Sequence, residues 1–266
     1  MMTTLVGKTE RDLNALYDSD GVVYGAGFSA DSQYAKQLAE DGVLTEDIQS
    51  RLEEDDYLSH ALYNVKVRAE YAQNRFGSLK LYIQEGPTFR YDVATIQPYK
   101  GNRKDSKKPK YYNEIREYLL DVWKAIPVKH IETDDALGIE QMKHPDKSTV
   151  IITQDKDLKT IPGWHWDPVK DLLFYQTLKD ADNFFFYQMM VGDTADHIPG
   201  IKRVGDKTAN AIIEACEHDT GRIREKVKEL YLKQYGVEWE AAYQEVGTLL
   251  YILRKEEHLE RGCPLL

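Results

Sequence analysis

The stretch that decides the fold is Ser148-Thr-Val-Ile-Ile-Thr-Gln-Asp-Lys-Asp157, an apolar run that closes on two aspartates. A short β-branched run of this kind is typical of a buried strand, and Asp155 and Asp157 follow its carboxyl end. Ligands of open α/β sheets bind at that end of the strands. The stretch therefore predicts an α/β fold with acidic side chains at one edge of a sheet.

Acidic residues recur in three other clusters along the chain, and the first lies between two short apolar stretches, 15–17 and 22–24. Carboxylates at the ends of neighbouring strands converge on one spot. A dense anionic pocket is unstable without hard divalent cations, and Mg²⁺ or Mn²⁺ takes oxygen ligands. The sequence thus predicts a metal site. The three clusters are Asp18-Ser-Asp20, Glu132-Thr-Asp134-Asp135 and Asp193-Thr-Ala-Asp196.

Hydrophobic periodicity predicts the other elements. Residues 79–83 are expected to form a strand that runs into a turn at Gly86-Pro87, so that Glu85 stands at another strand end. Apolar residues at intervals of three and four predict helices elsewhere, while Pro, Gly and Trp between 161 and 169 predict a loop. The expected helices cover residues 29–77, 111–124, 183–191, 206–216 and 222–254.

Length and composition favour one enzyme-sized intracellular unit. With 266 residues and 42% hydrophobic content, the chain can fill a sizeable core. No signal peptide or membrane-spanning run is found, so a cytoplasmic location is expected, in the host cell if a phage encodes the chain. Cys216 and Cys263 lack the spacing of a zinc site or a disulfide framework.

The formal charge of -10 argues at first against a nucleic-acid partner, but the charge is segregated. One basic run spans residues 100–110, with a single Asp105 in it, and a second follows the last acidic cluster. A solvated surface is the common meaning of a lysine run. Basic phosphate contacts beside acidic metal ligands are, however, what a metal-dependent nuclease needs. The basic residues are Lys100, Arg103, Lys104, Lys107, Lys108, Lys110, Lys202, Arg203 and Lys207.

The most specific stretch runs from Gly192 to Ala209 as a glycine-bounded loop that feeds a helix. The free N–H groups of a helix start can hold a phosphate. A tight turn between two helices is the alternative. Each Asp-x-Asp pair also has two alternative interpretations, a solvated turn or a calcium-binding loop. The calcium loop fails for Asp155 because Thr160 and Trp166 stand where Gly and Glu are required.

The order of these motifs resembles the 5′-nuclease (flap endonuclease) superfamily, and most closely its short phage replication 5′-3′ exonucleases. The resemblance covers residues 18–254 and implies a PIN-like α/β core with a mainly parallel sheet flanked by helices, a helical arch over 104–124 and a helix-three-turn-helix motif. It implies one 5′-nuclease domain over 1–266, with its core at about 13–191, the helix-three-turn-helix at about 183–216 and a C-terminal helical segment at about 222–256.

Carried over residue by residue, the resemblance implies two metal ions that share Asp134. Asp135 and Asp193 would support the ligands from outside, and Lys100 and Arg103 would lie over the scissile phosphate. The first ion would be held by Asp18, Glu85, Glu132 and Asp134, and the second by Asp134, Asp155, Asp157 and Asp196.

The resemblance also implies contacts to duplex DNA and a potassium ion at the helix-three-turn-helix. Two positions depart from the family pattern: Glu85 stands where Asp is usual, and Arg203 stands where a glycine is common. The implied DNA contacts are Arg90, Lys104, Lys107, Lys108, Gly200, Lys202, Arg203, Gly205 and Lys207.

The activity expected from these features is Mg²⁺-dependent hydrolysis from the 5′ ends of duplex DNA, with RNA–DNA hybrids and 5′ flaps as further substrates, in phage-type replication or recombination. Two alternatives remain. A PIN-like ribonuclease shares a related acidic core but ordinarily lacks the glycine-bounded helix pair. A catalytically silent module could bind duplex DNA through the same helix pair and lysines.

Overall fold

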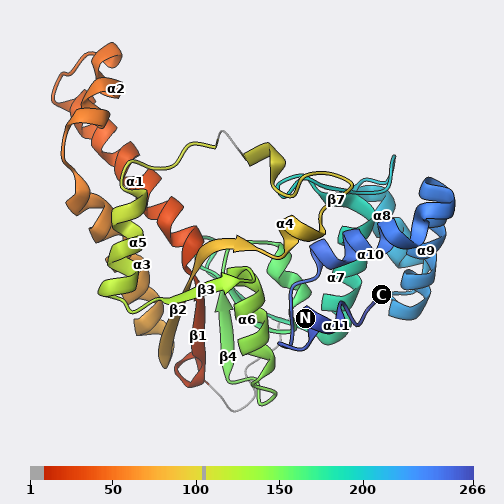
Figure 1. Ribbon diagram of the computed structural model, residues 1–266. Helices are drawn as coiled ribbons and strands as arrows, with labels where there is room; N and C mark the ends of the chain where they lie inside the picture. Colours follow the sequence, from red (N-terminus) through yellow and green to blue (C-terminus); the bar gives the residue numbers. More distant parts are fainter. Residues whose placement is uncertain (1–8, 104–105) are drawn as a thin grey trace.

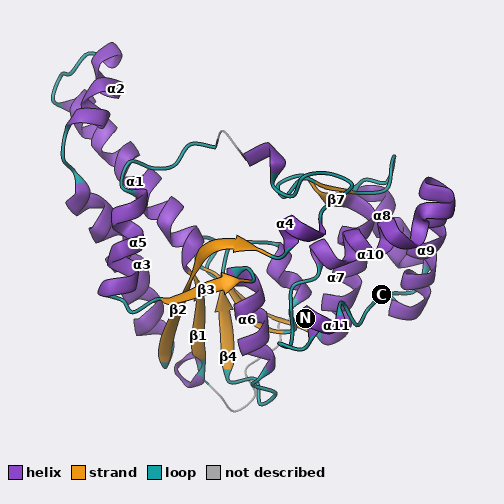
Figure 2. Cartoon of the chain, in the orientation of Figure 1, coloured by secondary structure: helices purple, strands orange, loops and turns teal. Residues whose placement is uncertain are grey.

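The computed structural model describes residues 9–103 and 106–266, which fold around one mainly parallel sheet (Figures 1 and 2). The strand order is β3-β2-β1-β4-β5-β6, and only β6 is antiparallel to its neighbour. The predicted α/β class is confirmed. The strands are β1 (Asn14–Asp18), β2 (Ser78–Thr88), β3 (Ile126–His130), β4 (Thr149–Ile152), β5 (Gly163–Asp167) and β6 (Leu172–Gln176).

Alternate residues of the central strands enter two different apolar layers. On β1, Ala15 and Tyr17 pack into one layer and Leu16 into the other. On β4, Ile151 joins the layer of Leu16, while its two neighbours join the opposite one. Because both faces of the sheet are covered, these strands are apolar along their whole length, as parallel strands usually are.

Helices α1, α3 and α5 pack on one face of the sheet and α6 on the other. With α2, the first three form the tall column beside the sheet in Figure 1. The predicted helical region 29–77 is confirmed as three helices. The bounds are α1 (Ser19–Glu40), α2 (Thr45–Glu54), α3 (Leu58–Arg75), α5 (Tyr112–Asp121) and α6 (Thr133–Met142), with the short η1 (Glu10–Asp12), α4 (Arg90–Val93), η2 (Gly101–Arg103) and η3 (Asp157–Thr160).

The C-terminal helices surround a separate apolar cluster beyond the sheet (Figure 1). The predicted helix pair is α7 and α8, and the two-stranded sheet of β7 and β8 lies between them in the chain. A Cβ on Gly192, whose φ is +73°, would lie 2.4 Å from the Gly200 nitrogen, so this approach requires glycine. The elements are α7 (Leu178–Val191), β7 (Gly192–Asp193), β8 (Ile198–Pro199), α8 (Asp206–Ala215), α9 (Thr220–Tyr235), η4 (Gly236–Glu238), α10 (Trp239–Leu250) and α11 (His258–Arg261).

No helix of the described residues combines the length and apolar character that a membrane span requires.

Three predicted elements differ from the structure. The expected loop at 161–169 contains β5, in which Trp164 and Trp166 are buried against neighbouring strands and helices. β2 continues through the expected turn at Gly86-Pro87 to Thr88, with a break in register to β3. The last expected helix ends at Leu250, and residues 251–254 are not helical.

The predicted arch is helical only in part. Residues 106–111, which we call the crossing, lead into the column of α1 and α3 (Figure 1). Residues 106–109 have no regular structure, and α5 begins only at Tyr112. Lys104 lies outside the described residues. The proline at 109 explains why residues 106–109 form no helix, because a proline disfavours the helical conformation in the residue before it.

A buried ion pair joins the sheet region to the C-terminal helices. Arg90 donates to both carboxylate oxygens of Asp135, at 2.6 and 2.8 Å, and to the backbone oxygens of Leu249 and Tyr251. Asp135 in turn accepts from the Leu253 amide. Arg90 is 1% exposed and Asp135 is fully buried. The pair therefore fixes the end of α10 and the non-helical residues after it against the start of α6.

We predict that Arg90→Ala lowers the free energy of unfolding by about 3 to 5 kcal/mol, because it leaves a buried carboxylate without its partner. Arg224→Ala, which removes an exposed ion pair on α9, should cost less than about 1 kcal/mol. Denaturant titration of both variants measures the difference. A loss below 1 kcal/mol for Arg90→Ala would contradict this role.

Candidate active site

A cavity of about 1020 Å³ lies at the carboxyl ends of β1 and β4. The strand order leaves β1 in two directions, toward β2 and β3 and toward β4 and β5, so these two ends flank the switch point where α/β proteins bind ligands. Carboxylates and basic residues from several elements line it. They are Asp18 and Asp20 around the start of α1, Glu132 and Asp134 at the start of α6, Asp155 after β4, and Lys100 and Arg103 near η2.

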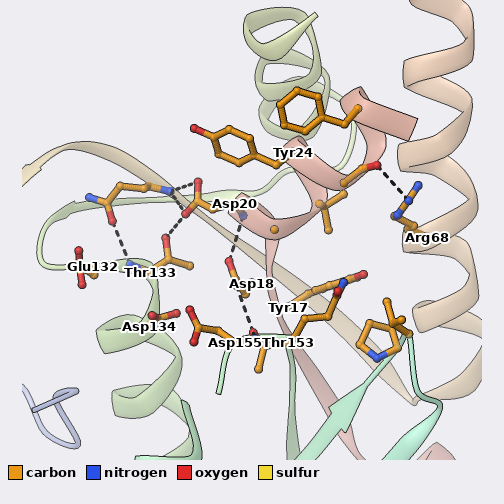
Figure 3. Close-up of a pocket in the computed structure, with 18 of the residues that line it drawn as sticks. Tyr17, Asp18, Asp20, Tyr24, Arg68, Glu132, Thr133, Asp134, Thr153 and Asp155 are labelled. Carbon is orange, nitrogen blue, oxygen red and sulfur yellow. Dashed lines mark hydrogen bonds between the residues drawn. The ribbon is translucent and has the colours of Figure 1, made fainter. Parts of the chain in front are cut away.

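Three of these carboxylates, Asp18, Asp134 and Asp155, point toward one another (Figure 3). The Thr153 hydroxyl links two of them, since it donates to Asp18 at 3.3 Å and accepts from the Asp155 amide at 2.9 Å. Within residues 9–103 and 106–266, none of the three forms an ion pair with a lysine or arginine. We call these three residues the bare triad.

Burial and repulsion from neighbouring carboxylates disfavour charge on Asp18 and Asp134. Burial, with repulsion from Asp20 and Asp155, raises the pKa of Asp18 to about 7. Burial, with repulsion from Asp18 and Asp155, also raises the pKa of Asp134 well above its ordinary value. At neutral pH Asp18 and Asp134 therefore carry charge only at a cost in free energy, unless a cation compensates it.

Glu132 and Asp196 have cationic partners instead. Lys100 donates to Glu132 at 2.6 Å and lies 3.7 Å from Asp196, which Arg103 contacts at 2.5 Å. The Tyr99 hydroxyl lies within 3.0 Å of both carboxylates and can donate its proton to only one at a time. Burial would raise the pKa of Glu132, but Arg90 and Lys100 lower it below its ordinary value.

The loop that carries these cations is fixed to the segment after α7. Lys100 has a left-handed backbone, with φ of 52°, and its amide donates to the Asp196 carbonyl at 2.9 Å. Arg103 also donates to the Ala195 carbonyl, and Asn102 to that of Thr194. Such a conformation is uncommon for lysine and persists where surrounding contacts hold it. The cations are thus held in place before any ligand arrives.

A third acidic group lies beside the bare triad. The Asp157 amide donates to Asp155 at 2.9 Å, and the buried Gln188 amide of α7 donates to the Asp157 carboxylate at 2.7 Å. Burial, with repulsion from Asp155 and Asp193, raises the pKa of Asp157 to about 8. Asp193 is buried, 3.9 Å from the ammonium of Lys156. Of the predicted second ligand set, Asp157 is therefore linked directly to Asp155, whereas Asp196 lies with Tyr99 and Arg103.

Glu85 is not among the carboxylates that the structure brings together. Because β2 continues past the expected turn, the Glu85 side chain is half exposed and pairs with Lys129 at 3.1 Å. Asp20 lines the cavity instead, where it accepts from the Gln84 amide at 3.1 Å and from the Thr133 hydroxyl at 2.7 Å (Figure 3). The structure thus places Glu85 outside the cavity, and its role as a ligand stays a prediction.

The expected DNA contacts divide into buried and exposed residues. The prediction is wrong for Arg90, because its buried side chain is enclosed by Asp135 and backbone oxygens. Arg203 has a left-handed backbone with φ of 66°, the conformation that makes glycine common there. Gly200 packs against the backbone of Val191. The exposed members are Lys107, Lys108, Lys202, Arg203, Gly205 and Lys207, while Lys104 lies outside the described residues.

Sequence reasoning missed several residues of this site. Asp20 belongs to a cluster that was recognised, but only Asp18 was chosen from it. Tyr99 directly precedes Lys100 and ties two acidic groups together. Arg116 of α5 contacts Asp20 at 3.4 Å, and Arg68 of α3 lines the cavity. Their proximity depends on how α3 and α5 pack, which no local motif encodes.

Sequence comparison finds relatives among phage enzymes, although no protein-family model matches the chain. The chain is 35% identical to the exodeoxyribonuclease of Enterobacteria phage T3 over 115 residues, which cover 41% of this chain and 38% of that protein. It is 34% identical to the exonuclease of Escherichia phage T7, with the same coverage. The chain thus spans well under half the length of these relatives.

Fold comparison extends the likeness to most of the chain. A complex of the D15 flap endonuclease of bacteriophage T5 with DNA and metal ions has a TM-score of 0.59, at 14% identity, over 92% of this chain and 90% of that chain. Such low identity bears on the fold alone. Together, the comparisons confirm the resemblance to the 5′-nuclease superfamily and to its phage exonucleases.

We predict that Asp18→Asn removes part of the pH dependence of stability in chelator. The pKa of Asp18 is raised in the folded state, so its contribution is full below about pH 4 and is lost as pH rises through about 7. Between pH 5.5 and 8.5, wild type should lose about 1 to 2 kcal/mol relative to the variant. Urea titrations measure this, with Asp121→Asn, at the exposed end of α5, as the control. A variant less stable than wild type at pH 8.5 would contradict the argument.

Proposed function

We propose that this chain is a metal-dependent 5′-3′ exonuclease that hydrolyses phosphodiester bonds from the 5′ ends of duplex DNA. The observation that carries the proposal is the bare triad, three converging carboxylates that have no cationic partner among the described residues, beside Lys100 and Arg103 on the same cavity. The cavity can therefore take a divalent metal ion at the bare triad together with a DNA phosphate at Lys100 and Arg103. The names of the phage T3 and T7 relatives support the reaction class.

The donor chemistry fits hard divalent cations, with Mg²⁺ proposed and Mn²⁺ as a substitute. Carboxylate oxygens are their preferred ligands, and a cation would remove the repulsion within the triad. Among the described residues, no three acidic, histidine or cysteine side chains are already arranged around a single point. The oxygens would therefore draw together on binding. The proposed holders are Asp18, Asp20, Glu132, Asp134, Asp155, Asp157 and Asp196.

Each group of the chain has a distinct part in this proposal. Bound cations would polarise the phosphate and acidify a water molecule. Lys100 and Arg103, already held by the loop contacts, would face the phosphoryl oxygens and stabilise the charge that develops there. Glu132 and Asp196 hold the side chains of Lys100 and Arg103 in position before substrate binds. Gln188 and Thr153 orient the carboxylates that they contact.

DNA binding is proposed to use the exposed basic residues of the crossing and of the helix pair. Lys202, Arg203 and Lys207 stand between α7 and α8 or at the start of α8, where free amides can also meet phosphate. The nuclease of phage T5 with this fold has been solved with DNA, which supports a DNA partner here. RNA–DNA hybrids and 5′ flaps remain proposed substrates, and a potassium ion at the glycine loop remains a proposal.

The test uses duplex, flap and hybrid substrates labelled at either end, with wild type and Asp134→Asn. We expect Mg²⁺-dependent release of the 5′ label first, no release with chelator, and a loss of at least about 100-fold in kcat for the variant. Faster cleavage of single-stranded RNA would favour a PIN-like ribonuclease. Duplex affinity without hydrolysis in Mg²⁺ or Mn²⁺ would favour a silent binding module.

A second prediction separates Asp20 from Glu85. We expect Asp20→Asn to weaken the stabilisation by Mg²⁺ about 10- to 100-fold in apparent affinity, because Asp20 faces the cavity. Glu85→Gln should change it less than about twofold, because Glu85 faces Lys129. Thermal melts over a Mg²⁺ series give both values. The opposite ranking would restore Glu85 as a ligand and remove Asp20.

A further inference from the structure

A second cavity, of about 500 Å³, shares Lys100 and Arg103 with the acidic site. Both residues line both cavities, so they form a basic divide between them. Among the described residues, the lining of the second cavity contains no carboxylate, whereas several line the first. The remaining lining residues are Tyr91, Ala94, Thr95, Pro98, Tyr99 and Gly101.

The walls of this cavity are held from outside. Glu245 of α10 accepts hydrogen bonds from the amides of Thr95 and Ile96, both at 2.7 Å, and from the Thr95 hydroxyl. The His197 ring contacts the Pro98 carbonyl at 3.0 Å, which the Gly101 amide also contacts. A site whose walls are fixed in this way loses little freedom when a ligand enters.

The lining combines aromatic surface with positive charge. Tyr91 is 50% exposed, although its ring packs edge-on against Tyr99 at 5.4 Å between centroids. The Lys100 ammonium lies 5.0 Å from the centre of the Tyr99 ring. An exposed aromatic ring stacks on a nucleobase of any identity, and the adjacent cations attract a phosphate. The volume lies within the range of small-ligand sites.

We propose that this cavity is a subsite for a nucleoside 5′-phosphate, with the base against Tyr91 and the phosphate at Lys100 and Arg103. The inference rests on the proposed function, because those two residues would then connect the subsite to the reacting phosphate. The described lining of the second cavity has no carboxylate that would repel a phosphate, which favours the second cavity over the acidic one as the nucleotide site. Tyr91 is a binding residue here, with no part in the chemical step.

The test is calorimetric titration of the Mg²⁺-loaded full chain with thymidine 5′-monophosphate and, separately, inorganic phosphate. Wild type should prefer the nucleotide by roughly 5- to 150-fold, the range that one stacked base contributes. Tyr91→Ala should remove most of this preference, and Tyr91→Phe should keep it. Tyr63→Ala is the matched control, since Tyr63 is 65% exposed on α3 and lines neither cavity.

The outcomes separate the inference from the function. If Tyr91→Ala binds both probes as wild type does, or if wild type shows no preference, the subsite is refuted even while DNA is hydrolysed. A chain that hydrolyses no DNA but keeps the Tyr91-dependent preference would refute the proposed function alone. A third arm titrates 5′-phosphorylated trithymidylate into Asp134→Asn, with and without Tyr91→Ala. If Tyr91→Ala weakens binding of the trinucleotide, the subsite holds the 5′ end of a strand. If it weakens binding of the mononucleotide alone, the subsite holds the released product.

Discussion

Repulsion among Asp18, Asp134 and Asp155 is the constraint to which the rest of the site responds. The sheet topology brings these carboxylates together at its switch point. Surrounding groups then divide the acidic residues into two sets. One set is Glu132 and Asp196, which contact Tyr99 and the cations Lys100 and Arg103. The other set is the bare triad, in which the repulsion remains. An arrangement that costs folding free energy at neutral pH is typical of a functional site.

The buried pair of Arg90 and Asp135 explains how two separate apolar clusters can meet at this site. Asp135 accepts from the Glu132 amide as well as from Arg90, so one carboxylate fixes both the start of α6 and the segment after α10. A displacement of the C-terminal helices would therefore move Glu132 and, through it, Lys100. The site depends on contacts between clusters as much as on the sheet.

The sequence was sufficient for the fold class and for most carboxylates, because strands and helices with strong periodicity carry acidic residues at their ends. The clusters that contain Asp18 and Asp155 were found beside apolar runs, and the family resemblance implied the individual ligands, including Asp134. Glu85 was assigned to a strand end because Gly86-Pro87 suggests a turn, whereas β2 continues through an irregular pairing with β3. Arg90 was assigned to DNA although it is buried. Burial and register depend on tertiary packing, which neither motif nor propensity determines.

The acidic net charge and a nucleic-acid partner are compatible once distance is considered. At about 0.1 M salt, exposed charges act over roughly 10 Å, so a phosphate near Lys100 responds to its neighbours rather than to the total of -10. Without a metal ion, those neighbours include Glu132 and Asp196, which hold Lys100 and Arg103. Neutralisation of these carboxylates would leave both basic side chains available to a phosphate. Metal and phosphate binding at this site should therefore strengthen each other, because each removes a charge that the other finds unfavourable.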